Sequence, residues 1–248
     1  MFESSQKRAY VRDMFARIAP RYDLLNRLMT FGLDARWRAQ AARLAVGENP
    51  APFVLDLATG TGDLARAIQN RAPNARVMGL DLVYEMLQYA QSKNNGIQTL
   101  PLPLLAGDAL DLPFPDHTFD ALTSAFMLRN VVSVERAFAE MRRVTKPGGR
   151  VVALEITQPR LPLWSALYKF YFYRFVPLLG GALSDSAAYR YLPASAARFV
   201  NADELARLMR DAGLQNVKYE LLNMGTVALH VGEKLESPAG FSAKLPAR

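Results

Sequence analysis

The sequence contains no cysteine and only two histidines among its 248 residues. The absence of cysteine excludes disulfide bonds, zinc–thiolate sites and a cysteine nucleophile, and it is typical of a cytosolic protein. No metal-ligand spacing is present, so we expect no metal site. Neither histidine is a strong candidate for a catalytic base. We expect His117 to be exposed in a turn, and His230 to be buried or hydrogen-bonded at the end of an edge strand.

Long uninterrupted hydrophobic runs are also missing. An aromatic-rich segment, Leu161 to Leu183, is long enough to suggest a transmembrane helix, but Lys169 and Arg174 would then lie inside the bilayer. We expect Pro177 and the nearby glycines to break the helix. The aromatic content favours a lid over an apolar substrate or an interfacial contact, with a plain core helix as the alternative. The first eight residues lack the apolar stretch of a signal peptide, so we expect a cytoplasmic protein.

The composition is that of a globular protein. Half of the residues are hydrophobic and 21% are charged, which fits one α/β domain with a full core. The net charge of +7 favours an anionic partner, either nucleic acid or a phospholipid surface. Charge alone does not distinguish these two partners.

The central feature is a strand, a glycine turn and a helix in immediate succession. Phe53–Leu57 is typical of a buried strand, Gly60-Thr61-Gly62 forms the turn, and Asp63 begins the helix. This order points free backbone N–H groups and the positive helix end at whatever lies above the strand. Glycine is needed because a side chain would hold a ligand off the backbone. The motif therefore predicts a nucleotide-type site.

Two cofactors fit this motif. Residues 60–65 satisfy the G-x-G-x-x-G/A dinucleotide fingerprint, and Asp81 lies where a ribose-binding acid belongs. Asp56, inside the strand, favours the other cofactor, because a carboxylate would repel a pyrophosphate but attract the cationic amino-acid tail of S-adenosylmethionine. We therefore expect S-adenosylmethionine. The alternatives are an NAD site and a buried, backbone-bonded role for Asp56.

Strands alternate with helices along the chain. Seven strands are expected, at Phe53–Leu57, Arg76–Asp81, Thr99–Leu105, Phe119–Phe126, Val151–Glu155, Val217–Leu222 and Thr226–His230. Helical patterns cover Tyr10–Val46 with a break at Phe31–Asp34, Glu135–Val144 before a stop at Lys146–Arg150, and Asn201–Ala212 with Asn201 as its cap. The alternation predicts an α/β fold with a doubly wound, Rossmann-like, mostly parallel seven-stranded sheet, an antiparallel edge hairpin and helical lid segments.

The expected domain organisation has three parts. Residues 1–48 form an N-terminal helical lid, and residues 49–232 form the cofactor-binding domain with an aromatic lid insertion at about 160–198. Residues 233–248 form a flexible tail. Simple packing of the first helices on the sheet edge is the alternative to a lid.

Several motifs together resemble a known family. Val54–Asp63 (VLDLATGTGD) resembles the first motif of class I S-adenosylmethionine-dependent methyltransferases, and Leu112–Asp116, Phe119-Asp120 and Lys146–Arg150 resemble the later ones. More narrowly, the ubiquinone/menaquinone biosynthesis C-methyltransferases are similar at Arg21–Asn26 (RYDLLN), Leu128–Val131 (LRNV), Tyr189–Ser195 (YRYLPAS) and Val227–His230 (VALH). The resemblance spans roughly residues 10 to 232.

The resemblance implies transfer of a methyl group from S-adenosylmethionine to a ring carbon of a polyprenylated quinol. Ala125 stands where many members have serine, and Met127 replaces a usual glycine beside the substrate. The expected cofactor-binding residues are Asp56, Ala58, Gly60, Thr61, Gly62, Asp81, Leu82, Asp108, Ala109 and Ala125.

The chemistry requires a phenolate-like quinol. A phenol has a pKa near 10, so its ionisation at neutral pH costs roughly 4 kcal/mol, and a cation in contact lowers such a pKa by about 1–3 units. We expect Arg129, just past the fourth strand, to supply this cation, Asn130 to hold the ring oxygen, and Tyr22 to close over the same place. The alternatives are a structural salt bridge for Arg129 and a structural role for Tyr22.

The resemblance also indicates which substrate and which partners to expect. Ser184–Ser186 and Tyr191–Ser195 are similar to members that methylate demethylmenaquinol, and a 2-methoxy-6-polyprenyl-1,4-benzoquinol is the alternative. A nucleic-acid methyltransferase is disfavoured because the sequence has neither an Asn/Asp-Pro-Pro-aromatic motif nor a cysteine. An NAD oxidoreductase and a catalytically silent cofactor-binding module remain as rivals. We expect a transient contact with the inner face of the membrane and no specific nucleic acid, and we leave a homodimer open.

Overall fold

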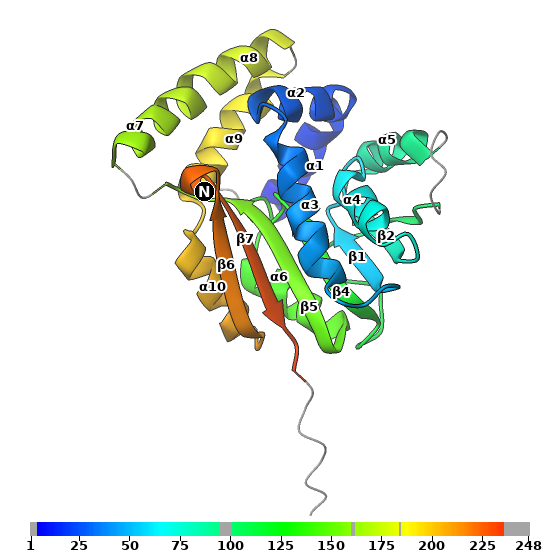
Figure 1. The fold of residues 1–248 in the computed structure, drawn as a ribbon. Coiled ribbons are helices and arrows are strands. Elements are labelled where there is room, and N and C mark those ends of the chain that lie inside the picture. Colours follow the sequence, from blue (N-terminus) through cyan, green and yellow to red (C-terminus); the bar gives the residue numbers. More distant parts are fainter. Residues whose placement is uncertain (1–3, 95–100, 160–161, 184, 236–248) are drawn as a thin grey trace, which may run out of the picture.

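A computed structural model describes residues 4–94, 101–159, 162–183 and 185–235 and contains a seven-stranded sheet (Figure 1). The strands are β1 (Phe53–Leu57), β2 (Arg76–Asp81), β3 (Leu104–Ala106), β4 (Phe119–Ala125), β5 (Thr145–Ile156), β6 (Gln215–Leu222) and β7 (Val227–Glu233). Their order in the sheet is β3-β2-β1-β4-β5-β7-β6. β1 to β5 are parallel, whereas β7 is antiparallel to both β5 and β6. The predicted doubly wound sheet with an antiparallel edge hairpin is confirmed.

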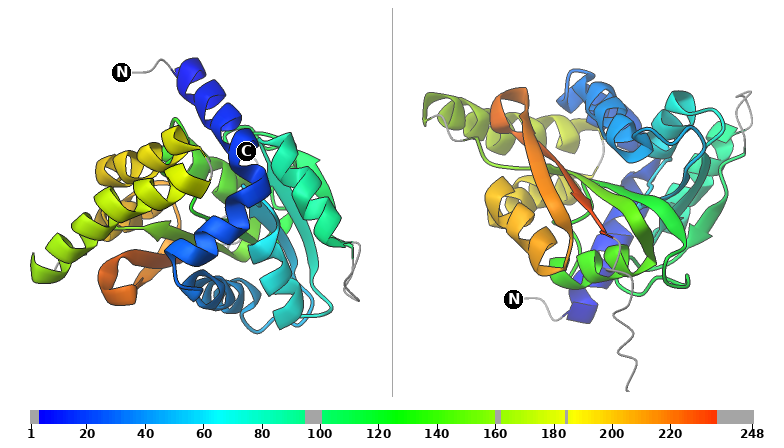
Figure 2. Two further views of the ribbon diagram at one scale, coloured as in Figure 1. Left: turned by 90° about the horizontal axis from the view of Figure 1, so that it is seen from above. Right: turned by 60° about the horizontal axis from the view of Figure 1, so that its bottom comes forward.

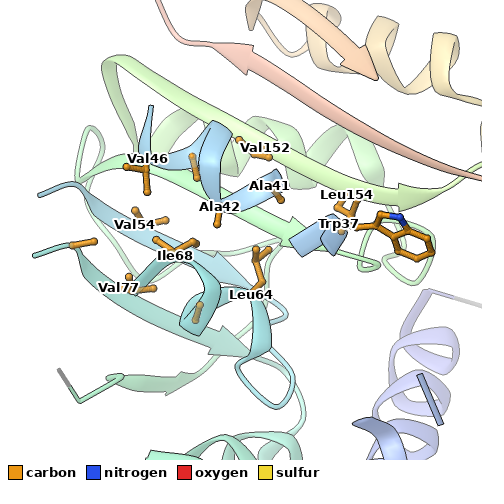
Figure 3. Close-up of a cluster of buried hydrophobic side chains, with 14 of the residues drawn as sticks. Trp37, Ala41, Ala42, Val46, Val54, Leu64, Ile68, Val77, Val152 and Leu154 are labelled. Carbon is orange, nitrogen blue, oxygen red and sulfur yellow. The ribbon is translucent and has the colours of Figure 1, made fainter. Parts of the chain in front are cut away.

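Helices cover both faces of the sheet, as a parallel sheet requires. On one face lie α3 (Leu33–Val46) and α4 (Asp63–Arg71), where Ala41 and Ala42 are fully buried and allow α3 to pack closely (Figure 3). Trp37 extends this cluster to Leu154 of β5. α3 belongs to the segment predicted as a lid, but most of it is part of the layer on the sheet, because it packs on β4 and β5.

The opposite face is covered by α6 (Val134–Val144) and α10 (Ala202–Asp211). Phe138 and Met141 of α6 and Met209 of α10 pack on Leu122 and its neighbours in the central strands. The Asn201 side chain accepts a hydrogen bond from the Glu204 N–H at 3.0 Å, which confirms the predicted helix cap. α5 (Tyr84–Asn94) follows β2 and packs near β3 at the sheet edge.

The remaining helices form a lid over the carboxyl ends of the parallel strands (Figure 1). They are α1 (Ser4–Ile18), η1 (Ala19–Arg21), α2 (Tyr22–Met29), α7 (Pro162–Phe170), η2 (Tyr171–Phe175), α8 (Val176–Leu183) and α9 (Ser186–Arg198), and a short turn, η3 (Asn223–Gly225), joins β6 to β7. Seen from above, α1 runs between α5 on one side and α9 on the other (Figure 2). Met14 and Leu25 of the first lid segment share a buried cluster with Phe172 and Tyr189 of the second. The two segments therefore form one packed unit.

The predicted break within Leu161–Leu183 is wrong. α7, η2 and α8 follow one another without interruption, with Pro177 in the first turn of α8. η2 is a π-helical turn, whose i→i+5 pattern widens the helix just before the proline and accommodates its missing N–H. Among the described residues, no helix is long and apolar enough to cross a membrane.

Several strand boundaries also differ from the expectation. β3 covers only Leu104–Ala106, and Thr99 lies outside the described residues. Lys146–Arg150 belongs to β5, which starts directly after α6 and contains Gly148 at φ +77°. β7 reaches Glu233 and is followed by a buried Lys234, so ordered structure continues beyond residue 232. The backbone of Lys234 exchanges hydrogen bonds with the glycines of β5, which the sequence pattern did not reveal.

Candidate functional site

A cavity of about 110 Å³ lies at the carboxyl ends of the first four strands, and α1 and α2 close it from above. We name it the small cavity. Its walls contain the residues that follow each strand: Ala58, Gly60, Leu80, Asp81, Leu82, Val83, Gly107, Asp108, Ala109, Leu110, Ala125, Phe126, Met127, Asn130, Val131 and Val132. The lid contributes Arg8, Val11, Phe15 and Tyr22, and α5 contributes Met86. Seven of the ten predicted cofactor residues line this space.

Asp81 is held by the backbone at the end of β2. Its carboxylate accepts one hydrogen bond from the Gly60 N–H and one from the Val83 N–H, each at 2.8 Å. Burial raises the pKa of Asp81 to about 6, although these hydrogen bonds partly oppose the shift. Each oxygen keeps a lone pair that could accept a further hydrogen bond. The arrangement suits a ligand with hydroxyl donors.

The turn after β1 brings the backbone close to this carboxylate. Ala58 and Gly60 both have left-handed backbones, at φ +49° and +56°. A Cβ added to Gly60 would meet only the Tyr22 ring, at 3.9 Å, so glycine here leaves room beside the cavity. Gly62 has another function, since its added Cβ would come within 3.2 Å of Leu102 and it precedes α4 at φ +84°. Gly62 does not line the cavity.

Asp56 does not face either of the cavities described here. Its carboxylate accepts hydrogen bonds of 2.7 Å from the hydroxyls of Thr59 and Thr123 and is buried beneath the turn. Burial raises the pKa of Asp56 to about 6, and the nearby Asp81 adds to this shift. In this structure both oxygens of Asp56 are turned toward threonines, Thr59 of the turn and Thr123 of β4, and its expected contact with the cationic tail of the cofactor stays a prediction. Its partners are side chains, so the backbone-bonded alternative is not correct in detail.

Thr61 connects the turn to the lid. Its hydroxyl donates to the Asp23 carboxylate of α2 at 2.6 Å, and Lys93 of α5 forms ion pairs with Asp23 at 2.5 Å and with Asp63 at 2.7 Å. The Thr61 side chain is buried in this contact and does not line the small cavity. Thr61 therefore holds the lid against the turn in this structure.

Asp108 lies in the small cavity but already has a cationic partner. The guanidinium of Arg8, from α1, lies 3.1 Å from one carboxylate oxygen of Asp108, and the Leu110 N–H donates to the other at 2.9 Å. Arg8 lines the same cavity. The sequence pattern gave no signal for this pair, because α1 and β3 meet only in the tertiary structure.

A second, larger cavity of about 430 Å³ lies under the lid. Most of its wall is aromatic or aliphatic and comes from both lid segments, including Phe31, Trp164, Leu167, Tyr168 and Tyr171. Its size and apolar lining are typical of a binding site for a drug-sized apolar ligand. We name it the large cavity.

Arg129 and Asn130 line the large cavity directly after β4. β4 ends at Ala125 and Phe126 adopts a left-handed backbone at φ +61°, which turns the chain toward the lid. Arg129 donates to the Phe126 carbonyl at 2.7 Å and to the Glu155 carboxylate at 2.6 Å. The predicted position of Arg129 at the crevice is confirmed, and the salt bridge considered as its alternative is present as well.

Five polar atoms in the wall of the large cavity have no hydrogen-bond partner among the described residues. They are Arg129 Nε, Asn130 Oδ1, Trp164 Nε1, Tyr189 OH and Tyr191 OH. Buried polar atoms without partners are rare and costly in folded proteins. An apolar ligand with a few oxygen atoms would supply the missing hydrogen bonds.

The two cavities share four lining residues: Phe15, Tyr22, Phe126 and Asn130. Tyr22 and Asn130 were predicted at this place, whereas Phe15 and Phe126 were not. Phe15 and Tyr22 make an edge-to-face contact at 6.0 Å, so the wall between the cavities is built by the first lid segment together with the residues that follow β4. The arrangement allows two ligands to meet at one point.

His117 lies where it was predicted, whereas His230 is buried as predicted but lies in the middle of β7, an inner strand, and not at the end of an edge strand. His117 is exposed in a turn, and His230 is buried with its Nε2 at 2.9 Å from the Ala202 carbonyl. Neither lines the cavities described above. Among the described residues, no three histidine, cysteine or acidic side chains are grouped to hold a metal ion.

Comparison with known proteins gives a consistent picture. The model of the ubiE/COQ5 methyltransferase family matches residues 3–234. A demethylmenaquinone methyltransferase of Thermus thermophilus is 48% identical over 222 residues, which cover 89% of this chain and 100% of that protein. A ubiquinone/menaquinone biosynthesis C-methyltransferase of Geobacter sp. (strain M21) is 40% identical over 240 residues, which cover 94% of this chain and 100% of that protein. A solved S-adenosylmethionine-dependent methyltransferase of Thermotoga maritima shares the fold with a TM-score of 0.62 and 19% identity, over 90% of this chain and 99% of that one.

Proposed function

The chain belongs to the ubiE/COQ5 methyltransferase family, and from this premise we propose that it methylates a ring carbon of demethylmenaquinol. It is an S-adenosylmethionine-dependent C-methyltransferase. The observation that carries the proposal is the pair of adjoining cavities. One surrounds Asp81 and the glycine turn, the other is aromatic and surrounds Arg129, and four side chains line both.

The residues of the small cavity fit S-adenosylmethionine, which supplies a methyl group carried on a positively charged sulfur. Asp81 would accept hydrogen bonds from the ribose hydroxyls, and Asp108 would accept one from the adenine amino group beside Ala109. Gly60 and Ala125 leave room for the rest of the molecule. The tail of the cofactor would have to be held by backbone groups, since the carboxylate of Asp56 is engaged elsewhere.

The large cavity would hold the quinol ring with its oxygen at Arg129 and Asn130. The unpartnered Arg129 Nε can donate to an ionised ring oxygen, and the unpartnered Asn130 Oδ1 can accept from a protonated one. Asn130 also lines the small cavity, so a ring bound there would lie next to the cofactor. Tyr22 and Phe126 would exclude water from the shared wall, which protects the developing charges from solvent.

The test is turnover on a defined quinol. Purified protein is mixed with S-adenosylmethionine and reduced short-chain demethylmenaquinone without oxygen, and the quinones are separated by mass spectrometry. We expect a product heavier by one methyl group. Arg129→Ala should bind S-adenosylhomocysteine normally but lose most of the turnover. An enzyme that binds the cofactor and leaves this quinol unmethylated would overturn the proposal.

A benzoquinol is the second candidate substrate. Relatives at about 40% identity are named for both ubiquinone and menaquinone biosynthesis, whereas those at 43–48% identity are named for demethylmenaquinone alone. Parallel assays with a 2-methoxy-6-polyprenyl-1,4-benzoquinol compare the two rings directly. A higher kcat/KM on the benzoquinol would reverse the assignment.

We also propose that the lid face contacts an anionic phospholipid membrane, from which a polyprenylated substrate must come. Residues 1–32 hold six basic and three acidic residues, and residues 160–198 hold five basic residues and one acidic residue, so these segments carry +3 and +4 and the rest of the chain has no net charge. On the same segments Phe31, Phe170 and Leu178 are 78%, 67% and 72% exposed. Phe31 and the exposed Leu167 also line the large cavity, which therefore opens on this face. Exposed aromatic residues with basic charge are typical of interfacial helices.

Vesicle sedimentation tests this contact. We expect binding to vesicles that contain phosphatidylglycerol, weaker binding to pure phosphatidylcholine, and loss at high salt. The double variant Phe170→Ser/Leu178→Ser should bind several-fold less. Leu235→Ser is the matched control, because Leu235 is also exposed but follows β7 at the opposite end of the sheet. If the double variant instead converts a dimer to a monomer in light scattering, the face is an interface between two copies.

A further inference from the structure

Arg129 carries a positive charge that is already balanced inside the protein. Its guanidinium Nη1 lies 2.6 Å from Glu155 Oε1, and the side chains of Arg129 and Glu155 are 6% and 1% exposed. The Arg129 N–H also lies 3.4 Å from the second carboxylate oxygen, and Glu155 Oε1 accepts from the Ile156 N–H at 2.9 Å. Glu155 is therefore fixed by the end of β5 and holds both the backbone and the side chain of Arg129.

Glu155 does not line the cavity that Arg129 faces. Ile156, the next residue, does line it, because successive residues of a strand point to opposite sides. Glu155 therefore makes no direct contact with a ligand in this cavity, although its charge is close enough to affect one. Nη1 is occupied by Glu155 and the Phe126 carbonyl, which leaves Nε without a partner among the described residues.

The other ionisable groups that line the large cavity add no net charge, and Arg198 of α9 acts on Tyr191 from outside this lining. Asp34 and Arg38 of α3 line the cavity and form their own buried ion pair. Burial raises the pKa values of Tyr168 of α7 and Tyr191 of α9, so both are neutral at physiological pH. On β7, Glu155 is paired with Ala228, which has no charge. The Arg129–Glu155 pair thus decides the local charge.

We propose that Glu155 is a positioning residue that aims Arg129 Nε at the substrate oxygen and cancels the charge of its guanidinium. The inference rests on the function proposed above. With this pair neutral, the charge of an ionised quinol would be balanced by that of the methyl donor. Transfer of the methyl group to the ring carbon would break the carbon–sulfur bond and remove both charges. Arg129 contributes an oriented donor, and the cofactor contributes the opposite charge.

A simple structural role for Glu155 predicts the opposite effect on the substrate. If Glu155 only supported Arg129, its neutralisation would misplace the guanidinium, and a bound phenol would become harder to ionise. If Glu155 also cancels the charge, its neutralisation leaves an uncompensated cation beside the phenol, which becomes easier to ionise. The two roles are therefore distinguished by the sign of one measured shift.

The experiment uses 4-nitro-1-naphthol, whose ionised form is coloured, as a bound probe in the absence of turnover. The pKa of the bound probe is measured by absorbance in the full-length protein saturated with S-adenosylhomocysteine. We expect Glu155→Gln to lower it by about 1–2 units relative to wild type. Arg129→Gln should raise it, because a buried Glu155 is then left without its partner. The double variant Arg129→Gln/Glu155→Gln should lie between wild type and Arg129→Gln.

The controls separate charge from shape. Glu155→Asp keeps the charge and should keep a pKa close to that of wild type, and Glu220→Gln, on the exposed edge strand β6, should change nothing. A pKa in Glu155→Gln that is unchanged or raised would overturn the inference. If that variant does not fold, equal values for Arg129→Gln and the double variant would overturn it. Failure of wild type to bind the probe would count against the proposed substrate site and this inference together.

Discussion

The hydroxyl of Thr61, in the turn after β1, donates a 2.6 Å hydrogen bond to the carboxylate of Asp23, in lid helix α2. The two residues are 38 positions apart in the chain, and their contact closes the lid over the small cavity. Lys93 strengthens the contact through its ion pair with Asp23. A site that needs a closed lid to exclude water must open it again for exchange of its ligands. Opening of the lid at this point would break the Thr61–Asp23 hydrogen bond.

The first prediction concerns this bond. Thr61→Val keeps the shape but removes the donor, and we expect S-adenosylhomocysteine to bind about 3–10-fold more weakly, since such a bond contributes about 1 kcal/mol. Hydrogen exchange in α2 should become faster. Asp23→Asn reaches the same bond from the lid and should reproduce both effects. A loss of affinity in Thr61→Val alone would mean that Thr61 contacts the cofactor directly. Thr118→Val, which removes a loop hydroxyl bonded to Pro115, is the control.

The second prediction concerns Asp81 and pH. With a pKa of about 6, Asp81 is ionised at neutral pH and protonated below pH 6. If the ionised form binds the ribose, affinity for S-adenosylhomocysteine should fall roughly tenfold for each pH unit below 6. Asp81→Asn should weaken binding by about 10–100-fold at pH 7.5 and abolish this pH dependence. Calorimetric titrations between pH 5 and 8 measure both effects. Asp211→Asn, at an exposed position at the end of α10, should behave as wild type.

The third prediction concerns the stability of the unliganded protein. The pKa of Asp56 is about 6 in the folded state and about 3.9 in the unfolded chain, so the folded state binds its proton more tightly. The contribution of Asp56 to stability therefore decreases as pH rises from about 4 to about 6. Asp56→Asn removes this pH-dependent contribution to stability. The hydroxyls of Thr59 and Thr123 can still form hydrogen bonds with the asparagine amide, because a hydroxyl can donate or accept. The free energy of unfolding of the variant minus that of wild type should therefore be about 1 kcal/mol more positive at pH 7 than at pH 5.

Urea unfolding at the two pH values measures this difference. Comparing each variant with wild type at the same pH also removes the effect of His230, whose lowered pKa makes acid destabilising in both proteins. The same free-energy difference at pH 5 and pH 7 would show that Asp56 does not titrate in this range.

The fourth prediction concerns Lys234, just past β7. Its ammonium group donates to the carbonyls of Arg142 and Thr145 at 2.7 and 2.8 Å and so satisfies the end of α6. Lys234→Met should keep the packing of the side-chain stem but lose these bonds, at a cost of about 2–4 kcal/mol. We expect the melting temperature to fall by roughly 4–16 °C. Lys218→Met, on exposed β6, should leave it unchanged, and an equal effect of both substitutions would contradict the capping role.

The cofactor was predicted correctly from the sequence, but the contacts of Asp56 do not support the step that selected it. The reasoning used Asp56 as the group that attracts a cationic tail, and the structure turns that carboxylate toward Thr59 and Thr123. The glycine turn and Asp81 alone are compatible with a dinucleotide as well. Family membership therefore carries the choice of cofactor.

The positions of Arg129, Asn130 and Tyr22 at the large cavity could be predicted because they follow local motifs. Glu155 could not be recognised as the partner of Arg129, because the sequence shows only that it lies at the end of a buried strand. Their pairing depends on the register of β4 with β5, which places Ala125 beside Leu154. Register is a property of two strands together, and neither strand contains it alone.

The sequence by itself determined the alternation of strands and helices, the turn that follows β1, and the family, because each depends on residues that are close in the chain. Only the tertiary structure decided which charged groups remain available. It buried Asp56 among threonines, joined Thr61 to Asp23, and balanced Arg129 with Glu155. The physical reason is that the charge a ligand meets is set by burial and by partners from distant segments, and these exist only once the chain has folded.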